Sequence, residues 1–400
     1  MAHDTLFAEL LSPAHRATPQ HLWAQLREQP VSRQEDGTWV VTGYDEVRAL
    51  SADPRISAAH DGDAEAEGSE QRTANFIVED PPEHNEDRAR VMRHFGPPHR
   101  PGFVASLETS INRYVDEALN HLQGRTRTDV VEDLAYPLPV SVICDVLGVP
   151  HEDEPQFSEW TKAMALLASP DARLDAEASQ QGAQASQEAR SYMFDLVQRR
   201  KTDPGEDMIS GMVNDESPNG RLSDEQIVSN AILLLIAGHE TTVNAIANGV
   251  LLLLRNPEQM NRLRTHPELM PGAFEEILRL ESPVQFRDRV ALSDIAIAGV
   301  TIPKGATVQL SYAAANRDPR RFTDPDRFDP EREDNQHLAF NTGLHFCFGA
   351  PLARLEGILA LTAWVRRLVN PRLVEDPPPY RRNAALRGPS QLLVDFDGVN

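Results

Sequence analysis

The chain carries Phe340-Asn341-Thr342-Gly343-Leu344-His345-Phe346-Cys347-Phe348-Gly349-Ala350-Pro351, in which a glycine-containing loop delivers one cysteine to the start of a helix. Apolar residues at helical spacing follow it and predict an amphipathic helix: Leu352, Leu355, Ile358 and Leu359. A sulfur at this place faces unpaired backbone N–H groups and the positive end of the helix dipole. Both favour the thiolate and lower the pKa of Cys347.

Two interpretations of Cys347 fit this context. The first is a small buried hydrophobic side chain, the usual role of a lone cysteine in a cytosolic protein. The second is a soft, anionic axial ligand, with Gly349 letting the backbone approach something large and flat. A haem-thiolate iron needs such a ligand, because the thiolate pushes electron density toward O–O cleavage. Other parts of the chain must decide between the two.

The composition is that of a globular protein with a strong acidic excess. The 400 residues are 40% hydrophobic and 25% charged, with a formal net charge of −22. This charge argues against nucleic-acid or anionic-membrane binding, and no apolar stretch reaches the ~18 residues of a bilayer span. The polar N-terminus shows no signal peptide. Two cysteines suit a reducing, cytoplasmic location, and Cys144 lies in an apolar stretch that indicates the core.

One basic segment departs from the acidic average. It holds Arg88, Arg90, Arg93, His94, His99 and Arg100, with no acid between Arg88 and Arg100. This Arg88–Arg100 patch is either a solvated helix face or a docking site for an acidic protein. The residue types alone leave both interpretations open.

Hydrophobic periodicity predicts a mainly α protein with a small β portion, an α+β class. Helical patterns occupy about 80–282 and 350–370, while β-prone segments occupy about 30–60, 284–312 and 372–398. Proline and glycine breaks separate the elements, but no clean linker divides the chain. Residues 1–400 are therefore expected to form a single domain.

One predicted helix is long and has polar residues in its middle. Ser223-Asp224-Glu225-Gln226 fits a capping box, and the helix runs to about Arg255. Its apolar flanks predict burial, yet its centre reads Ala237-Gly238-His239-Glu240-Thr241-Thr242. Either the hydroxyls bond back to i−4 carbonyls and bend the helix, or a ligand lies against this groove while Glu240 and Thr241 handle protons.

Two residue pairs add weaker signals. Glu276 and Arg279 are three apart on one predicted helix face, as in any amphipathic helix. His84 and Arg88 are one turn apart in another helix, where two cationic donors can hold a pair of carboxylates. Each pair alone is compatible with ordinary surface or core chemistry.

Together these motifs resemble a known family. They follow one another in the family's order: His84-x-x-x-Arg88, Ala237-Gly238-x-Glu240-Thr241, Glu276-x-x-Arg279 and the Cys347 loop. From about residue 20 to 398 the chain is similar to the soluble bacterial cytochromes P-450, the haem-thiolate monooxygenases. The resemblance implies the cytochrome P-450 fold, a single triangular domain with haem b between a long central helix and the cysteine loop.

The resemblance also implies residue roles. Cys347 would be the proximal iron ligand, with Phe340 and Gly349 on the sulfur side of the haem. The haem propionates would bind His84, Arg88, Arg289 and His345. Glu240 and Thr241 would relay protons to dioxygen, and Ala237 and Gly238 would leave room for that co-substrate. Glu276, Arg279 and Arg327 would form a buried charge triad behind the haem, with a structural role.

The chain departs from the family pattern at Asn341, where the family usually has glycine. Asparagine tolerates left-handed backbone conformations better than most residues, so the loop is expected to form.

Electrons and substrate would come from outside the chain. The sequence shows no glycine-rich dinucleotide fingerprint after a strand, so no flavin or NAD domain is expected. By family analogy a ferredoxin and its reductase would supply electrons by docking near Arg88, Arg93 and Arg100. The substrate would be a hydrophobic small molecule of secondary or xenobiotic metabolism, hydroxylated or epoxidised at a mostly apolar pocket. Its lining would come from residues 57–79, 156–195, 284–286, Leu233, Ile236, Ala237, Ala385 and Leu386.

Three rival functions remain in view. In the first, the same haem fold performs desaturation, coupling or dealkylation, or uses peroxide, and product analysis separates these. A non-catalytic haem protein needs no proton relay, so the intact Glu240–Thr241 pair counts against it. A hydrolase using Cys347 with His345 or His239 would be colourless, and it leaves the polar-centred helix and the His84–Arg88 pair unexplained.

Overall fold

Helices make up most of the protein. The computed structural model describes residues 3–59, 75–96, 99–167, 176–217 and 220–400. The α-helices are α1 (Leu6–Leu10), α2 (Gln20–Arg27), α3 (Tyr44–Ser51), α5 (Glu83–Met92), α6 (Phe103–Ser106), α7 (Glu108–Asn120), α8 (Pro137–Leu147), α9 (Glu154–Leu167), α10 (Ala176–Thr202), α11 (Met208–Val213), α12 (Asp224–Arg255), α13 (Pro257–Thr265), α14 (Met270–Leu280), α15 (Tyr312–Ala315) and α16 (Ala350–Arg367).

The strands are short and form small sheets. They are β1 (Val31–Arg33), β2 (Trp39–Val41), β3 (Ile56–Ser57), β4 (Arg127–Asp129), β5 (Phe286–Ala291), β6 (Ile295–Ile297), β7 (Val300–Ile302), β8 (Thr307–Ser311), β9 (Leu368–Val369), β10 (Arg372–Leu373), β11 (Leu393–Asp395) and β12 (Gly398–Val399). A five-stranded sheet has the order β1-β2-β8-β5-β3, and a three-stranded sheet has the order β10-β11-β4. Only the β2–β8 pair of the larger sheet is parallel.

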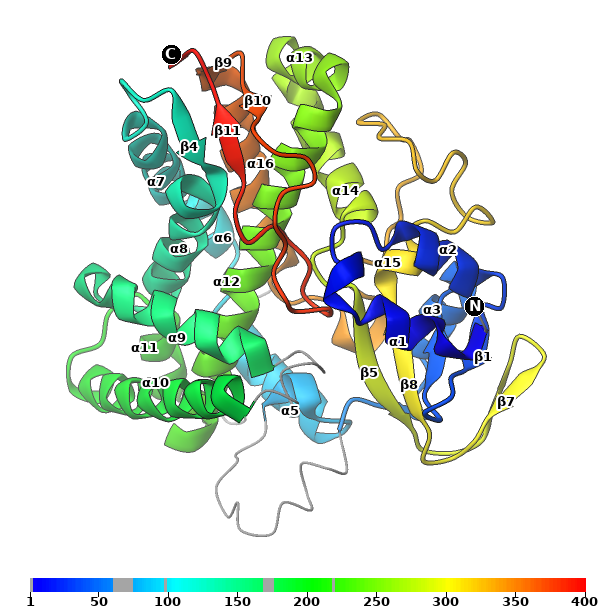
Figure 1. Ribbon diagram of the computed structural model, residues 1–400. Helices are drawn as coiled ribbons and strands as arrows, with labels where there is room; N and C mark the ends of the chain where they lie inside the picture. The colour runs from blue at the N-terminus through cyan, green and yellow to red at the C-terminus, as the bar shows by residue number, and fades with distance from the viewer. Residues whose placement is uncertain (1–2, 60–74, 97–98, 168–175, 218–219) are drawn as a thin grey trace.

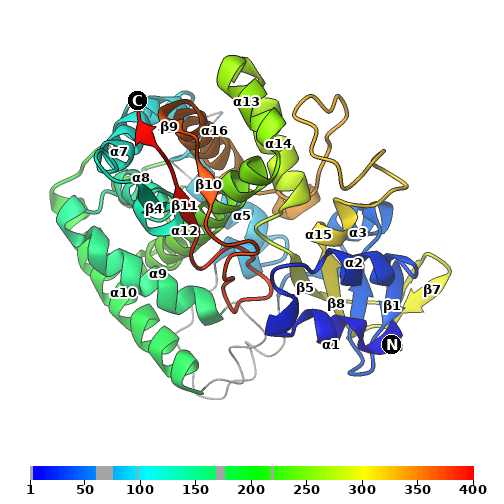
Figure 2. The same ribbon diagram turned by 45° about the horizontal axis from the view of Figure 1, so that its top comes forward.

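Most of the long helices lie on one side of the molecule and the five-stranded sheet lies on the other. Figure 1 shows α7 to α12 on one side and the N-terminal helices with β1, β5 and β8 on the other, and Figure 2 shows the same division. The predicted mainly α class with a small β portion is confirmed. Strand β9 lies at the end of the range 350–370 that was predicted to be helical, and strand β4 lies outside the predicted β-prone ranges. Strand β4 pairs with β11, some 260 residues later (Thr128 with Val394), and a three-residue strand with so distant a partner leaves no local pattern.

The long helix α12 lies at the centre of the helical side. The capping box is present, because Gln226 N–H donates to Ser223 Oγ at 3.2 Å and Ser223 N–H donates to Gln226 Oε1 at 3.0 Å. The helix spans 32 residues and contacts α8, α9, α10, α14 and α16. Contacts on all sides explain why its flanks are apolar all round. The same helix contacts hold the central turn of α12 in place.

The predicted charge triad forms with a different third member. Glu276 and Arg279 are fully buried and paired at 2.7 Å. The second arginine on Glu276 is Arg332, at 3.0 Å. The prediction of Arg327 is wrong: its guanidinium is 66% exposed and lies 3.4 Å from Asp329. Arg327 contributes its backbone carbonyl instead, which accepts from Arg279 at 3.3 Å.

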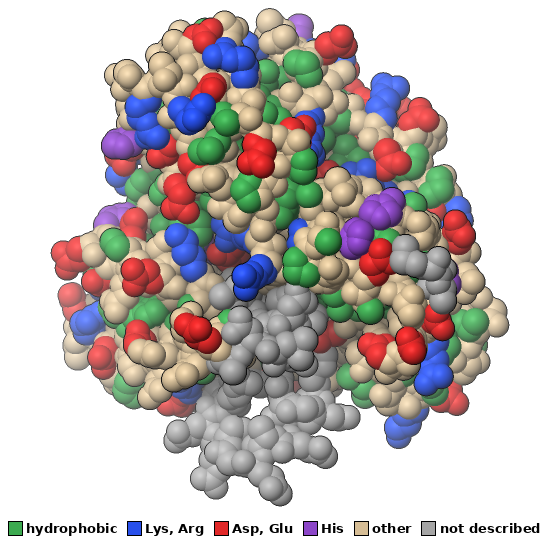
Figure 3. Space-filling model, in the orientation of Figure 1, with side chains coloured by type: hydrophobic (Ala, Val, Ile, Leu, Met, Phe, Trp, Pro, Cys, Tyr) green, Lys and Arg blue, Asp and Glu red, His purple; other side chains and the backbone are tan. Residues whose placement is uncertain are grey.

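Cys144 lies in the hydrophobic core, as its apolar neighbourhood indicated. It is fully buried on α8 among core side chains such as Val146 and Leu147. In the part of the chain that the structure describes, no helix is long and apolar enough to cross a membrane. Acidic and basic side chains are interspersed over the face shown in Figure 3.

Candidate active site

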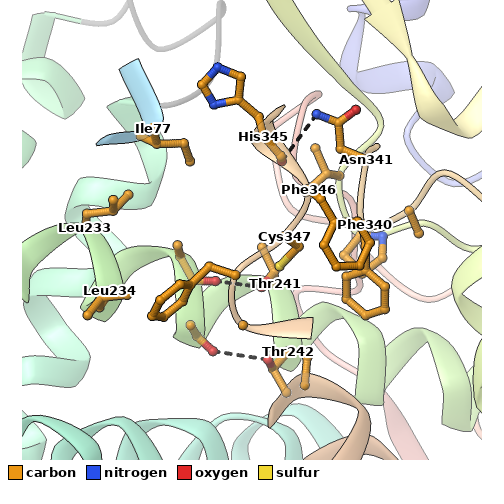
Figure 4. Close-up of a pocket in the computed structure, with 18 of the residues that line it drawn as sticks. Ile77, Leu233, Leu234, Thr241, Thr242, Phe340, Asn341, His345, Phe346 and Cys347 are labelled. Carbon is orange, nitrogen blue, oxygen red and sulfur yellow. Dashed lines mark hydrogen bonds between the residues drawn. The ribbon is translucent and has the colours of Figure 1, made fainter. Parts of the chain in front are cut away.

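The loop of residues 340–349 holds Cys347 at the start of α16. The Cys347 N–H donates to Phe340 O at 2.8 Å. Asn341 takes the left-handed conformation expected of it, with φ 59°, and its amide donates to His345 O at 3.4 Å (Figure 4). Gly343 is also left-handed, and a Cβ there would meet Ser51 O at 2.9 Å. A side chain at 343 would therefore push the loop away from α3.

Burial and local charges act in opposite directions on the Cys347 thiol. Desolvation raises the pKa of Cys347, whereas the Gly349 N–H, Arg88 and the Ala350 N–H lower it, and the net direction is upward. The predicted donors are present, but the predicted lowering of the pKa is wrong for the protein alone, because desolvation outweighs them. A metal cation on the sulfur reverses this balance, since coordination deprotonates a thiol.

The central turn of α12 lines the same pocket as Cys347. Ala237, Gly238, Thr241 and Thr242 share with the sulfur a cavity of about 320 Å³. Thr241 Oγ1 donates to Ala237 O at 2.7 Å, and Thr242 Oγ1 donates to Gly238 O at 3.1 Å (Figure 4). The hydroxyls therefore bond back to the helix, as the first interpretation expects. The same turn lines a cavity, as the second requires, and the ligand and the proton relay stay predictions.

Gly238 also has a packing role. A Cβ on this residue would meet Ile143 Cδ1 of α8 at 3.3 Å, closer than most such contacts. Glycine thus lets α8 approach α12 beside the pocket. Its predicted role of leaving room for dioxygen stays a prediction.

Glu240 points away from the pocket. Among the described residues, Thr241 lines the cavity and Glu240 does not. Glu240 Oε2 instead accepts from Arg381 at 2.7 Å, and Glu240 Oε1 is buried with no hydrogen-bond partner in the described part of the chain. Burial raises the pKa of Glu240, while Arg381 and then Lys162 lower it. The Arg381 side chain is 20% exposed, so the ion pair connects the buried carboxyl to the surface.

His239 joins three elements behind the pocket. Its ring is fully buried, with Nδ1 2.8 Å from Thr161 Oγ1 of α9 and Nε2 3.3 Å from Tyr136 O. It packs edge-on against the Tyr136 ring at 4.5 Å. Burial lowers the pKa of His239 to about 3. The imidazole is therefore a neutral structural group, and it contributes nothing to a nucleophile pair with Cys347.

The depressed pKa of His239 predicts a loss of stability in acid. The unfolded histidine takes up a proton below about pH 6.5, whereas the folded one does so only near 3. Between these values the unfolded state binds the extra proton, so stability falls as pH falls, by up to about 1.4 kcal/mol per pH unit. The variant His239→Gln should lose less stability between pH 6.5 and 4.5 in urea unfolding. His121→Gln, at an exposed histidine, is the control, and parallel wild-type and His239→Gln profiles would contradict the assignment.

The residues predicted to hold propionates gather at one edge of the pocket. Arg88, Arg289 and His345 line it. His84 lies behind His345, with ring centroids 4.5 Å apart, and the buried His84 Nε2 finds no partner in the ranges that the structure describes. Arg88 donates to Phe346 O at 2.7 Å and Arg289 donates to Asp288 O at 2.7 Å. Burial lowers the pKa of His84 and lowers that of His345 to about 4.

The pocket fits a flat, apolar and doubly anionic group. Phe340 and Phe348 line it from the loop, and Ala237 and Leu233 line it from α12. Within the described residues, neither Arg88 nor Arg289 pairs with a carboxylate, and unpaired cations in a partly buried place are costly. Two carboxylates at this edge would satisfy both arginines and the free His84 nitrogen. Haem has this shape and charge, and Cys347 offers it one sulfur.

Some pocket residues were missed by sequence reasoning. Arg287 and Tyr312 line it beside Arg289, and Glu356 lines it from α16. Burial raises the pKa of Glu356 to about 8, so it is neutral at pH 7. Arg287 has a sequence signal, because residues two apart on a strand share a face. The partner of Glu240, Arg381, lies 141 residues away and has none.

Comparisons with known proteins give one family for this chain. The family model described as Cytochrome P450 matches residues 31–396. The chain is 34% identical to 6-deoxyerythronolide B hydroxylase of Saccharopolyspora erythraea, covering 98% of this chain and 100% of that protein. It is 37% identical to vitamin D(3) 25-hydroxylase of Pseudonocardia autotrophica, covering 96% of each. CYP109E1 of Bacillus megaterium, solved with testosterone, matches with a TM-score of 0.84 at 32% identity, covering 95% of this chain and 99% of that one.

The predicted family is thus confirmed over nearly the whole chain. Both relatives are named hydroxylases, and the solved structure has the same fold. The chain belongs to the cytochrome P450 family and is a monooxygenase of the haem-thiolate type.

Proposed function

We propose that this protein binds haem b through the Cys347 thiolate and inserts one oxygen atom of O2 into a C–H bond of a hydrophobic small molecule. The observation that carries the proposal is the shared pocket, where the Cys347 sulfur and the Ala237–Thr241 turn line one cavity. Phe340 and Gly349 would lie on the sulfur side. The residues proposed to hold the propionates are His84, Arg88, Arg289 and His345.

The bound haem would supply the oxidising chemistry, and the chain supplies position and proton control. The Thr241 hydroxyl is held by its bond to Ala237 O, so its oxygen stays at the pocket surface, where it can pass a proton to the co-substrate. Glu240 is the adjacent proton source. Because burial raises its pKa, this carboxyl carries a proton at higher pH than an exposed glutamate. Arg381 keeps it in place and links it to the surface.

The proposed substrate is largely apolar. The distal part of the pocket is lined by Ile77, Val78, Leu233, Leu234 and Val284, and burial of a substrate against such side chains is favourable by about 25 cal/mol per Å². Leu386 forms a β-bridge with Val284 at this wall. The predicted lining from 57–79 and 156–195 falls partly within the described residues, because the segments 60–74 and 168–175 lie outside them. The named substrates of the relatives support a bulky molecule.

The proposed electron donor is an external ferredoxin that docks at the Arg88–Arg100 patch. Within this patch, Arg90 pairs with Asp87 at 2.8 Å, and Arg93 contacts Ser217 and lies 3.9 Å from Asp215. Arg88 faces the pocket. Arg100 lies over the Phe103 ring at 4.1 Å and donates to Glu206 O at 2.6 Å. Arg100 therefore has no carboxylate partner among the described residues. It tests docking more directly than Arg93, because Arg93 already lies near the carboxylate of Asp215.

Reversing the charge of Arg100 should slow electron delivery. We expect Arg100→Glu to reduce the rate of the first electron transfer from an acidic ferredoxin about 10-fold at low salt, with the difference shrinking as ionic strength rises. Stopped-flow reduction trapped with carbon monoxide measures this rate. The control is Arg372→Glu on β10, an exposed arginine far from α5 in Figure 1. Equal rates for wild type and Arg100→Glu at low salt would contradict docking at this patch.

The absorption spectrum of the reduced protein under carbon monoxide tests the proposed function. A red-shifted Soret band reports a thiolate ligand, whereas a neutral axial ligand gives a bluer band. Absence of a haem band in folded protein would contradict the whole proposal. A thiolate band together with labelled oxygen from O2 in a product would support it, and product structure distinguishes hydroxylation from desaturation or coupling.

A further inference from the structure

One arginine of the pocket is left over after the residues assigned to the propionates. Arg287 lines the cavity and is half-buried. In the described part of the chain, its guanidinium makes no hydrogen bond or ion pair. Burial is the largest influence on its pKa, which it lowers. Arginine nevertheless stays charged in proteins, so this side chain is an unpaired cation in an otherwise mostly apolar enclosure.

The strand geometry directs Arg287 to the pocket and sets it apart from Arg289. On β5, Phe286 packs against Phe7 and Trp23, with ring centroids 5.3 and 6.3 Å away. Residues 287 and 289 therefore share the opposite face, about 7 Å apart along the strand. Arg287 is the one nearer to Pro283 and Val284, which line the apolar part of the cavity.

Electrostatic neighbours also separate the two arginines. The charges that most affect His345 are Arg289, His84, Asp80 and Arg88. Those that most affect Arg287 are Tyr312, Arg289 and Asp288. Arg289 thus belongs to the cluster assigned to the propionates, whereas the charges that act on Arg287 include neither His84 nor Arg88. Tyr312 lies close to both Arg287 and Arg289. Asp288 also lines the cavity, but it forms no ion pair with Arg287.

Tyr312 adds a second free donor at the same place. It is 3% exposed, lines the cavity, and its buried hydroxyl has no hydrogen-bond partner among the described residues. Burial raises its pKa, so the hydroxyl keeps its proton. A buried phenol and a guanidinium that lack partners are both satisfied by one anionic oxygen group, and an arginine binds a carboxylate through two parallel hydrogen bonds.

We propose that Arg287 and Tyr312 form an anchor for a carboxylate on the substrate, so that this enzyme oxidises an apolar molecule bearing an acid group. The inference rests on the proposed function, because it needs the haem to occupy Arg88 and Arg289. Haem has two propionates, and the pocket has three arginines. The third arginine is available to the substrate, whose apolar body then lies along Leu233 and Val284.

A matched pair of probes tests the anchor on the haem-loaded enzyme. Dodecanoate and dodecan-1-ol have the same chain and differ in charge, and each is titrated by the spin-state change of the Soret band. Wild type should bind dodecanoate more tightly than dodecan-1-ol. Arg287→Gln should weaken dodecanoate binding roughly 10- to 100-fold and leave dodecan-1-ol unchanged, and Tyr312→Phe should weaken it roughly 2- to 10-fold. Arg287→Lys should restore part of the loss.

Haem content separates an anchor from a propionate ligand. Arg287→Gln should retain haem and the red-shifted carbon monoxide band, whereas Arg289→Gln should lose haem more readily. Comparable haem loss in both variants would overturn the inference. Wild type that binds the two probes equally, or binds neither of them, would also overturn it. Absence of the red-shifted carbon monoxide band in wild type would contradict the proposed function itself. That result is distinguishable from failure of the anchor, in which the band is present.

Discussion

Cys347→Ser is expected to abolish the red-shifted Soret band of the reduced protein under carbon monoxide and to reduce product formation to background. A serine hydroxyl is a far weaker acid than a thiol, so it offers no anionic, polarisable ligand to iron. Removing an outer partner of a metal ligand already costs about 10- to 100-fold, and removing the ligand itself should cost more. The absorption spectrum and turnover with the same substrate measure both effects.

The second cysteine gives a matched control for this substitution. Cys144 is fully buried in α8 and does not belong to the described pocket lining, although its neighbour Ile143 does. Cys144→Ser makes the same chemical change and should leave the Soret band intact while costing about 1–3 kcal/mol of stability, because a hydroxyl replaces a thiol in an apolar core. If both variants keep the red-shifted band, Cys347 is not the ligand. If both lose it, the spectrum reports folding and not ligation.

The sequence predicted those parts of the site that depend on short spacing. The cysteine loop, the polar turn of α12 and the Glu276–Arg279 pair each lie within one local segment, so residue order fixed which side chains could meet. Asn341 follows the same rule, since its left-handed φ of 59° is the conformation that asparagine tolerates.

The features that escaped prediction join distant segments. Arg381 reaches Glu240 across 141 residues, and β4 pairs with β11 from the far end of the chain. No local pattern specifies such partners, because tertiary packing decides them. The pKa of Cys347 was misjudged for a related reason. The local donors were visible in the sequence, but the desolvation that outweighs them depends on what encloses the loop.

The choice between Arg327 and Arg332 shows how a motif can give the right chemistry with the wrong residue. Both arginines lie in the irregular segment that follows α15, and their positions in the sequence do not tell which of them contacts α14. The structure pairs Arg332, which is 12% exposed, with Glu276, and leaves Arg327 mostly in solvent. Because the two side chains differ in exposure, the same substitution should lower the free energy of unfolding more at Arg332 than at Arg327.

Glu276→Gln should lower the free energy of unfolding by about 3–5 kcal/mol, the cost of leaving a buried charge without its partner. Glu276 accepts from Arg279 twice at 2.7 Å, from Arg332 at 3.0 Å, and from the Asp329 N–H and Asn335 at 3.2 Å. A neutral amide cannot compensate the fully buried Arg279. Urea unfolding followed by circular dichroism measures the change.

Arg327→Gln and Arg332→Gln form the internal comparison for this cluster. Arg332→Gln removes one partly buried donor from Glu276 and should cost about 1–3 kcal/mol. Arg327→Gln removes an exposed pair and should change stability by less than about 1 kcal/mol. Similar losses for the two arginine variants would mean that Arg327 does reach Glu276 in solution. A small loss for Glu276→Gln would mean that the neighbouring carbonyls, which accept from Arg279 at 2.7 and 2.8 Å, suffice to hold its charge.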